Sequence, residues 1–175
     1  MRAAACTAVA QLGESVAHQA IPVLTKILRD GTVNRQTVAE TMINVGPLGE
    51  QTLVQILKNE PENNHKLREC IIRALALANV NNPNVDFVIE VLFQTSKDKN
   101  PQVRKSSLLS LDILHKKVPN DSVTYLKARH LLPFFYRCLS DKDAGVRASA
   151  LLCIQNFGPQ GELMFIEGLT KDRTW

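Results

Sequence analysis

Five arginines recur along the chain at spacings that are typical of tandem helical repeats. They are separated by 33, 33, 36 and 43 residues, and an apolar run ends eleven residues after each of them. A period of this length indicates supersecondary units that stack, because a single unit cannot bury its own apolar face. Stacked units expose long surfaces and do not enclose one reaction pocket, which favours a binding function. The arginines are Arg2, Arg35, Arg68, Arg104 and Arg147.

A helix is predicted directly after each arginine. Apolar or small residues occupy the positions three, four, seven and ten after it, and this spacing places them on one face of a helix. In the second unit these residues are Val38, Ala39, Met42 and Val45. Apolar runs before the arginines predict a partner helix in each unit, and strand patterns are absent from the sequence. The partner helices are expected around residues 21–28, 53–57, 88–93, 131–139 and 163–169.

Glycine and proline mark the junctions between units. Gly46-Pro47 and Gly158-Pro159 each combine a residue suited to a left-handed turn at one helix end with a residue suited to the first turn of the next helix. Both ends of the chain fall inside a unit, so we expect the array to continue into further repeats or to be covered by a partner. The predicted divisions are a half unit 1–13, units 14–46, 47–80, 81–116 and 117–158, and a half unit 159–175.

The turns inside the units carry a recurring polar motif. Residues 139–147 read Leu-Ser-Asp-Lys-Asp-Ala-Gly-Val-Arg, and residues 96–104 repeat much of this pattern. Together with Leu-Leu-Pro at 131–133 and Ile-Pro at 21–22, the motif resembles the HEAT-repeat family of armadillo-like proteins. The resemblance covers nearly the whole chain and is weakest where residues 60–64 lengthen a turn. It implies an all-α, right-handed superhelix of about five helix pairs, with the second helices on the concave side.

Charge and cysteine use favour an intracellular protein. The net charge of +4 and the pI of about 9.0 are mildly basic, but the basic residues are scattered and form no stripe for nucleic acid. The four cysteines lie far apart in apolar helical patterns, which is typical of buried thiols in a reducing compartment. No run of about 18 apolar residues predicts a membrane span. We therefore expect a cytoplasmic location, with cytoskeletal or ciliary association as an option.

The sequence contains no pattern that predicts catalysis. An iron-dependent hydroxylase of this architecture would resemble its family through His-Glu pairs, which place a nitrogen and a carboxylate at the metal. None of the four histidines in this chain precedes a glutamate. His65 and Glu69 have the spacing of two ligands on one helix, but no second pair completes a metal site. Cys138 lies eight residues from His130, too far for a nucleophile to reach a base along one helix. We predict no enzyme, no metal and no cofactor, and a HEAT-like lyase or metal-dependent enzyme is the catalytic alternative.

The repeated arginines allow two interpretations. A guanidinium suits bidentate pairing with a carboxylate, and acidic residues lie in the turns beside the arginines. The arginines would then hold neighbouring turns in register and leave little charge for partners. The alternative is a row of cations that binds a phosphate backbone or an acidic partner. The predicted structural ladder consists of Arg35, Arg68, Arg104 and Arg147 with Asp30, Asp98, Asp141 and Asp143.

The exposed face of the second helices is the predicted binding surface. Positions one, five and eight after each arginine are expected to point away from the core, on the concave side. Leu109 and Leu152 are apolar at these positions, which predicts a hydrophobic strip flanked by charges. If the alignment is off by one residue, these side chains pack against a neighbouring helix instead. The predicted contact residues are Gln36, Glu40, Glu69, Arg73, Lys105, Leu109, Asp112, Leu152 and Gln155.

The longest unit offers a second candidate surface. A loop is predicted from residue 116 to residue 122, and insertions in repeat arrays often serve binding, although a solvated linker fits equally well. Its basic residues, with Lys105, would also serve the rival function of a helical-repeat module that binds nucleic acid. The prediction that the repeats favour is a non-catalytic scaffold for other proteins, whose identity no motif specifies. The basic residues of this segment are Lys116, Lys117, Lys127 and Arg129.

Overall fold

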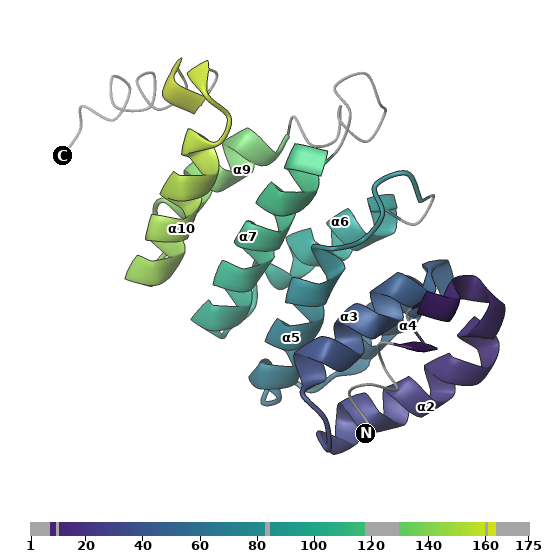
Figure 1. The fold of residues 1–175 in the computed structure, drawn as a ribbon. Coiled ribbons are helices and arrows are strands. Elements are labelled where there is room, and N and C mark those ends of the chain that lie inside the picture. The colour runs from purple at the N-terminus through teal and green to yellow at the C-terminus, as the bar shows by residue number, and fades with distance from the viewer. Residues whose placement is uncertain (1–7, 10, 83–84, 118–129, 160, 164–175) are drawn as a thin grey trace.

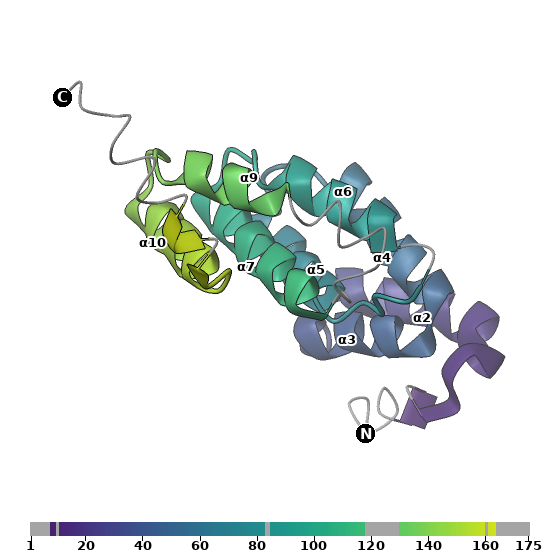
Figure 2. The ribbon, with the colours of Figure 1, turned by 90° about the horizontal axis from the view of Figure 1, so that it is seen from above.

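The helices of the chain form two layers that lie side by side (Figures 1 and 2). A computed structural model describes residues 8–9, 11–82, 85–117, 130–159 and 161–163. Within these residues, one layer contains the first helix of each pair and the other layer contains the second. The first helices are α2 (Ala17–Asp30), α4 (Pro47–Asn59), α6 (Val85–Thr95) and α9 (Leu131–Cys138). The second helices are α3 (Arg35–Val45), α5 (His65–Leu75), α7 (Pro101–Lys117) and α10 (Ala144–Gln155), and a 3-10 helix, η1 (Gly13–Val16), precedes α2.

Each helix pair packs on the pair that follows it. In the second-helix layer α3 contacts α5, α5 contacts α7 and α7 contacts α10, while each first helix packs on its own partner. The described residues contain four complete pairs and no β-strand. The all-α solenoid that the arginine spacing predicts is therefore confirmed. None of the helices in the described ranges is both long enough and apolar enough to cross a membrane.

The core lies between the layers and is built from the positions that the sequence pattern predicts. On α3, the side chains of Val38, Ala39, Met42 and Val45 are all fully buried. The same four positions are buried in the α5 and α7 units. The pattern fails in the α10 unit, where Leu151 is 39% exposed. Helices α3, α5 and α7 are each followed by a second helix that packs on them, whereas the described residues contain no second helix after α10.

Glycine permits the closest approach between α3 and α4. A Cβ atom on Gly49 would lie 1.8 Å from the carbonyl oxygen of Met42, so a larger residue cannot fit unless a helix moves. Pro47 begins α4 as predicted, directly after Gly46. The backbone of Gly46 has φ 115° and ψ −162°, which only glycine adopts readily. This conformation differs from the left-handed helical turn that the sequence predicts for this residue.

Helix α7 is longer than the sequence predicts. It continues to Lys117, so the prediction of a loop beginning at Lys116 is wrong for these two residues. Both lysines have partners that favour the helix. Lys116 pairs with Asp112 one turn earlier at 2.9 Å, and the Nζ of Lys117 donates to the carbonyl oxygen of Ala76 at 2.8 Å. The remaining basic residues predicted for this segment, at positions 127 and 129, lie outside the described residues.

Candidate functional site

Two arginines of the predicted ladder join neighbouring helix pairs through aspartates. Arg104, on α7, donates from Nε and Nη2 to the two carboxylate oxygens of Asp141, at 2.8 and 2.7 Å. Asp141 lies in the turn of the next pair, between α9 and α10. Arg68, on α5, forms an ion pair with Asp98 in the turn that precedes α7. Both arginines also donate to carbonyl oxygens of their own turns, so each guanidinium fastens one turn to the next.

The charges of the Arg104–Asp141 pair stabilise each other. Its hydrogen bonds to Asp141 raise the pKa of Arg104, and the same guanidinium lowers the pKa of Asp141. The side chain of Arg104 is 6% exposed and that of Asp141 is 16% exposed. Because each charge is matched and largely shielded from water, neither is free to bind a phosphate or an acidic partner.

Arg35 makes contacts that differ from the sequence prediction. Its Nε donates to the carbonyl oxygen of Leu28 at 3.0 Å, and its Nη2 donates to that of Arg29 at 3.1 Å. Among the described residues, no ion pair joins it to Asp30. The guanidinium instead satisfies carbonyl groups that the end of α2 leaves without helical partners.

Arg147 and Asp143 also have roles other than the predicted pairing. Arg147 donates to the carbonyl oxygens of Asp141 and Lys142, at 2.8 and 3.2 Å. Asp143 accepts the backbone N–H of Val146 at 3.0 Å and thereby caps the first turn of α10. A short acidic side chain is favoured at this position because the first amides of a helix have no helical acceptor.

The surface of α3, α5, α7 and α10 that faces away from the first helices, here named the outer face, is the predicted binding surface. Exposed or half-buried side chains occupy the positions one, five and nine after the arginine of each helix. The prediction of position eight is wrong for Ile43, Ala76 and Asp112, which are buried. Neighbouring second helices cover that position, and only a narrow strip with four-residue spacing stays open. The outer-face residues are Gln36, Glu40, Asn44, Glu69, Arg73, Leu77, Lys105, Leu109, Ile113, Ala148, Leu152 and Asn156.

Asp112 belongs to the interior and not to the predicted contact surface. It is 5% exposed and lies between α7 and α10. Its Oδ2 accepts a hydrogen bond from Nδ2 of Asn156 at 2.9 Å and pairs with Lys116 at the same distance. The carboxylate therefore ties the end of one second helix to the end of the next.

A groove between α5 and α7, here named the α5–α7 groove, contains four of the predicted contact residues. Its volume is about 450 Å³, and it combines apolar side chains with three charged ones. Glu69 and Arg73 form an ion pair one turn apart on α5. The hydroxyl of Ser110 donates to the carbonyl oxygen of Ile72 at 3.0 Å, so this polar group is already satisfied. The lining residues are Glu69, Arg73, Ala76, Gln102, Lys105, Ser106, Leu109, Ser110 and Ile113.

The other predicted contact residues lie on the flanking helices of the outer face. On α3, Nε2 of Gln36 donates to Oε1 of Glu40 at 2.8 Å. On α10, Leu152 is 56% exposed and Gln155 is exposed beside it. Apart from Asp112, every predicted contact residue is at least partly open to solvent. Their role in binding stays a prediction.

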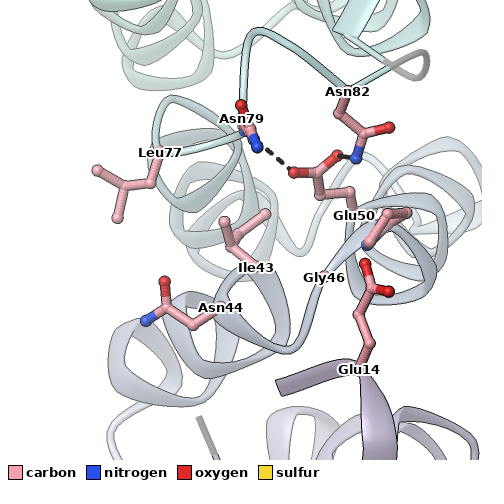
Figure 3. Close-up of a pocket in the computed structure, with 9 residues that line it drawn as sticks. Glu14, Ile43, Asn44, Gly46, Glu50, Leu77, Asn79 and Asn82 are labelled. Atoms are coloured by element: carbon pink, nitrogen blue, oxygen red, sulfur yellow. Dashed lines mark hydrogen bonds between the residues drawn. The ribbon is translucent and has the colours of Figure 1, made fainter. Parts of the chain in front are cut away.

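A second cavity, here named the acidic pocket, opens at the C-terminal ends of α3 and α5 (Figure 3). Its volume is about 370 Å³. Glu50, on α4, is 2% exposed and accepts from the backbone N–H of Asn79 at 3.1 Å and from Nδ2 of Asn82 at 2.7 Å. Glu14 supplies a second carboxylate, and no lysine or arginine is among the lining residues. The other lining residues are Ile43, Asn44, Gly46, Pro47 and Leu77.

The hydrogen-bond donors around the buried carboxyl group of Glu50 favour its ionised form. Burial raises the pKa of Glu50, and the N–H of Asn79 lowers it in part. Both donors are N–H groups, which can donate a hydrogen bond but cannot accept one. The ionised carboxylate only accepts hydrogen bonds and therefore fits these donors better than the protonated acid, whose O–H would need an acceptor. No ion pair neutralises this carboxylate within the part of the chain that the structure describes.

The sequence prediction missed the acidic pocket, although a repeated motif marks it. Residues 46–50 read Gly-Pro-Leu-Gly-Glu, and residues 158–162 read Gly-Pro-Gln-Gly-Glu. In both segments the second glycine lies against a carbonyl oxygen of the preceding helix, since a Cβ atom on Gly161 would lie 2.2 Å from that of Ile154. The glutamate follows at a fixed place beside the junction of two pairs. If the glycines at 46–49 are considered only as a possible phosphate-binding loop, nothing draws attention to Glu50, the glutamate that follows them.

The cysteines of the described helices are free thiols with suppressed reactivity. Burial raises the pKa of Cys70 and Cys138 to about 11 and that of Cys153 to about 12. These thiols are protonated at neutral pH. A protonated thiol is a weak nucleophile, because the thiolate is the reactive form. In the residues that the structure describes, no three His, Cys, Asp or Glu side chains lie close enough together to hold a metal ion.

Comparison with known proteins identifies a family and a similar fold. Residues 66–171, more than half of the chain, match the family Cnd1, described as non-SMC mitotic condensation complex subunit 1. The crystal structure of an engineered protein from a structural genomics consortium has a TM-score of 0.54 and 15% sequence identity to the chain. The alignment covers 98% of this chain and 83% of that protein, and at such identity the likeness concerns the fold alone. A search of curated proteins found no match.

Proposed function

The chain belongs to the family of non-SMC mitotic condensation complex subunit 1, and on that premise we propose that it is a non-catalytic scaffold whose outer face binds another protein of such a complex. The architecture supports this function, because stacked helix pairs present a long surface on which several side chains can contact one partner. The predicted contact residues of the α5–α7 groove lie at the centre of that surface.

The observation that carries the proposal is that each of three successive second helices exposes a large apolar side chain on the outer face. Leu77, at the end of α5, is 46% exposed, Ile113 on α7 is 40% exposed and Leu152 on α10 is 56% exposed. Single exposed leucines are common on protein surfaces and need no explanation. Several of them on one face, together with charged side chains, are the composition expected of a protein interface.

The family also changes the expected location. Its description refers to a mitotic condensation complex, and it gives no support to the cytoplasmic, cytoskeletal or ciliary location that the sequence suggested. We propose that the chain acts with condensing chromosomes. Localising a tagged chain through the cell cycle tests this, and a signal that stays away from mitotic chromosomes would contradict it.

The rival functions have less support. Binding of nucleic acid requires free cations, whereas Arg68 and Arg104 of the ladder are paired with Asp98 and Asp141. Two of the lysines predicted for this function are also engaged, because Lys116 pairs with Asp112 and Lys117 donates to the carbonyl oxygen of Ala76. The enzyme alternatives, a lyase or a metal-dependent enzyme, receive no support from the family description. A protein-binding scaffold is the function that both the outer face and the family favour.

Changing Leu109 and Leu152 together to serine is expected to lower recovery of the partner at least about tenfold, because the few side chains that dominate the centre of an interface each cost about 2 kcal/mol or more when they are truncated. The measurement is quantitative mass spectrometry of condensation-complex subunits that co-purify with the tagged chain from mitotic cells. Val23→Ser is the matched control, since Val23 is 58% exposed on α2, in the other layer. Equal recovery with the double variant and the control would contradict the proposal, provided that circular dichroism shows both to be folded.

A further inference from the structure

The acidic pocket and the α5–α7 groove meet at the end of α5. Leu77 lines the acidic pocket (Figure 3), and the preceding residue, Ala76, lines the groove. Leu77 is 46% exposed at this meeting point. The two hollows are therefore lined by consecutive residues, and the exposed side chain of Leu77 lies where they approach each other.

The two hollows carry opposite charge. The acidic pocket is lined by Glu14 and Glu50 and by no cationic side chain. In the groove, Arg73 is neutralised by its ion pair with Glu69. Lys105 also lines the groove and has no ion pair among the described residues, which leaves the groove with one positive charge in excess.

We propose that one extended segment of a partner protein crosses Leu77, with a lysine or arginine side chain in the acidic pocket and an aspartate or glutamate side chain beside Lys105. This inference rests on the proposed function, to which it adds the chemistry and the orientation of the bound segment. An apolar side chain of the segment packs on Leu77 between the two charges. The occupant is thus a short stretch that is basic at one end and acidic at the other.

The acidic pocket suits a basic side chain for two reasons. The long aliphatic stem of lysine or arginine can lie on the apolar wall formed by Ile43 and Pro47, while its charged end reaches the carboxylates. The carboxylate of Glu50 is 2% exposed and lacks a cationic partner in the described structure. A charge held in such surroundings gains more from an opposite charge than an exposed one does.

The dimensions of the surface set the length of the segment. Lys105 and Ile113 are eight residues apart on α7, which corresponds to about 12 Å at 1.5 Å per residue. Crossing from this groove over α5 adds about 8–10 Å, the usual separation of packed helices. The path is therefore about 20 Å long, which an extended chain covers with about six residues at 3.3 Å each.

The test is selection of binders from a phage-displayed library of random twelve-residue peptides on the full chain at low salt. We expect the enriched peptides to place a basic and an acidic residue about six positions apart, with an apolar residue between them. Peptides with one order of the charges should be preferred, because the two hollows fix the direction. The double variant Glu14→Lys with Lys105→Glu should abolish this preference, because the new lysine offsets the charge of Glu50 and the groove loses its excess positive charge, with about a tenfold fall in the affinity of the selected peptide measured by fluorescence polarisation.

The outcomes separate this inference from the proposed function. The inference would be overturned if the enriched peptides had no preferred order of charges, or kept their order when selected on the double variant. If these peptides also bound less tightly to Leu109→Ser, the proposed function would still stand. Enriched peptides that are indifferent to Leu109→Ser would count against both. A library that yields no binder also overturns the inference. The neutral variants Glu14→Gln and Lys105→Gln, each expected to weaken the selected peptide, provide the comparison if the charge reversals disturb folding.

Discussion

Arg104→Ala is expected to lower the free energy of unfolding by about 3 kcal/mol, because it leaves the carboxylate of Asp141 without its partner between two helix pairs. The guanidinium is 6% exposed and donates to both oxygens of that carboxylate, at 2.7 and 2.8 Å. It also donates to the carbonyl oxygens of Asp98 and Lys99, which lose a donor in the variant. Since repeat arrays are stabilised by contacts between neighbouring units, the loss should fall on the contact of the α6–α7 pair with the α9–α10 pair.

Arg147→Ala is the matched control for this variant. Arg147 occupies the same position in the next pair, but its contacts are exposed hydrogen bonds to carbonyl oxygens. Its removal should cost less than about 1 kcal/mol. Urea unfolding followed by circular dichroism measures both variants. Equal losses for the two arginines would show that the ion pair with Asp141 does not hold the array together.

The same pair predicts a loss of stability in acid. Because the pKa of Asp141 is lowered in the folded chain, its stabilisation is fully present above the ordinary aspartate pKa of about 3.9. It is lost as the pH falls below that value and through the lowered pKa. In Asp141→Asn the group cannot titrate, so the free energy of unfolding should fall less steeply with acid. An identical slope in the variant and the unaltered chain, from urea unfolding at a series of pH values, would contradict this expectation.

Gly49→Ala is expected to destabilise the chain by about 3 kcal/mol, because the added methyl group must force α4 away from α3. The Cβ atom would lie 1.8 Å from the carbonyl oxygen of Met42, which belongs to the backbone and cannot rotate aside. The preference of a helix for alanine over glycine offsets at most about 1 kcal/mol of this cost. Thermal unfolding should therefore show a clear fall in Tm.

Gly145→Ala is the control for that substitution. Gly145 lies inside α10, and the nearest atom to an added Cβ is Oδ1 of the Asp143 side chain, at 3.1 Å. A side chain can shift slightly where a backbone carbonyl cannot, so the free energy of unfolding should change by less than about 1 kcal/mol. Equal falls in Tm for Gly49→Ala and Gly145→Ala would show that the close approach of α3 and α4 does not restrict the size of the side chain at position 49.

The architecture could be predicted from sequence because the arginines and the apolar positions repeat together. Position four after the arginine illustrates this, since Ala39, Ile72 and Leu108 are all fully buried. Leu151 is the exception, because the described residues contain no second helix after α10 that would pack on it. Helical periodicity identifies a face, but tertiary packing decides how much of that face is buried.

The details of the site depended on contacts that periodicity cannot show. Asp112 was expected on the surface, but the adjacent α10 encloses it and Asn156 supplies a donor. Arg35 was expected to pair with an acid, but the end of α2 presents carbonyl oxygens to it first. Glu50 was missed because its donors, Asn79 and Asn82, lie 29 and 32 residues further along the chain, between α5 and α6, and carry no charge. Each of these contacts joins residues that the sequence alone gives no reason to pair.

Site-specific photocrosslinking tests the binding role of the outer face most directly. A photoreactive benzoylphenylalanine is placed at Leu109, in the α5–α7 groove, and separately at Val23, on the other layer, and each chain is irradiated in mitotic cells. Crosslinks from position 109 to a subunit of a mitotic condensation complex, with none from position 23, are the expected result. Crosslinks to such a subunit from position 23 alone, or from both positions equally, would show that the outer face is not the binding surface.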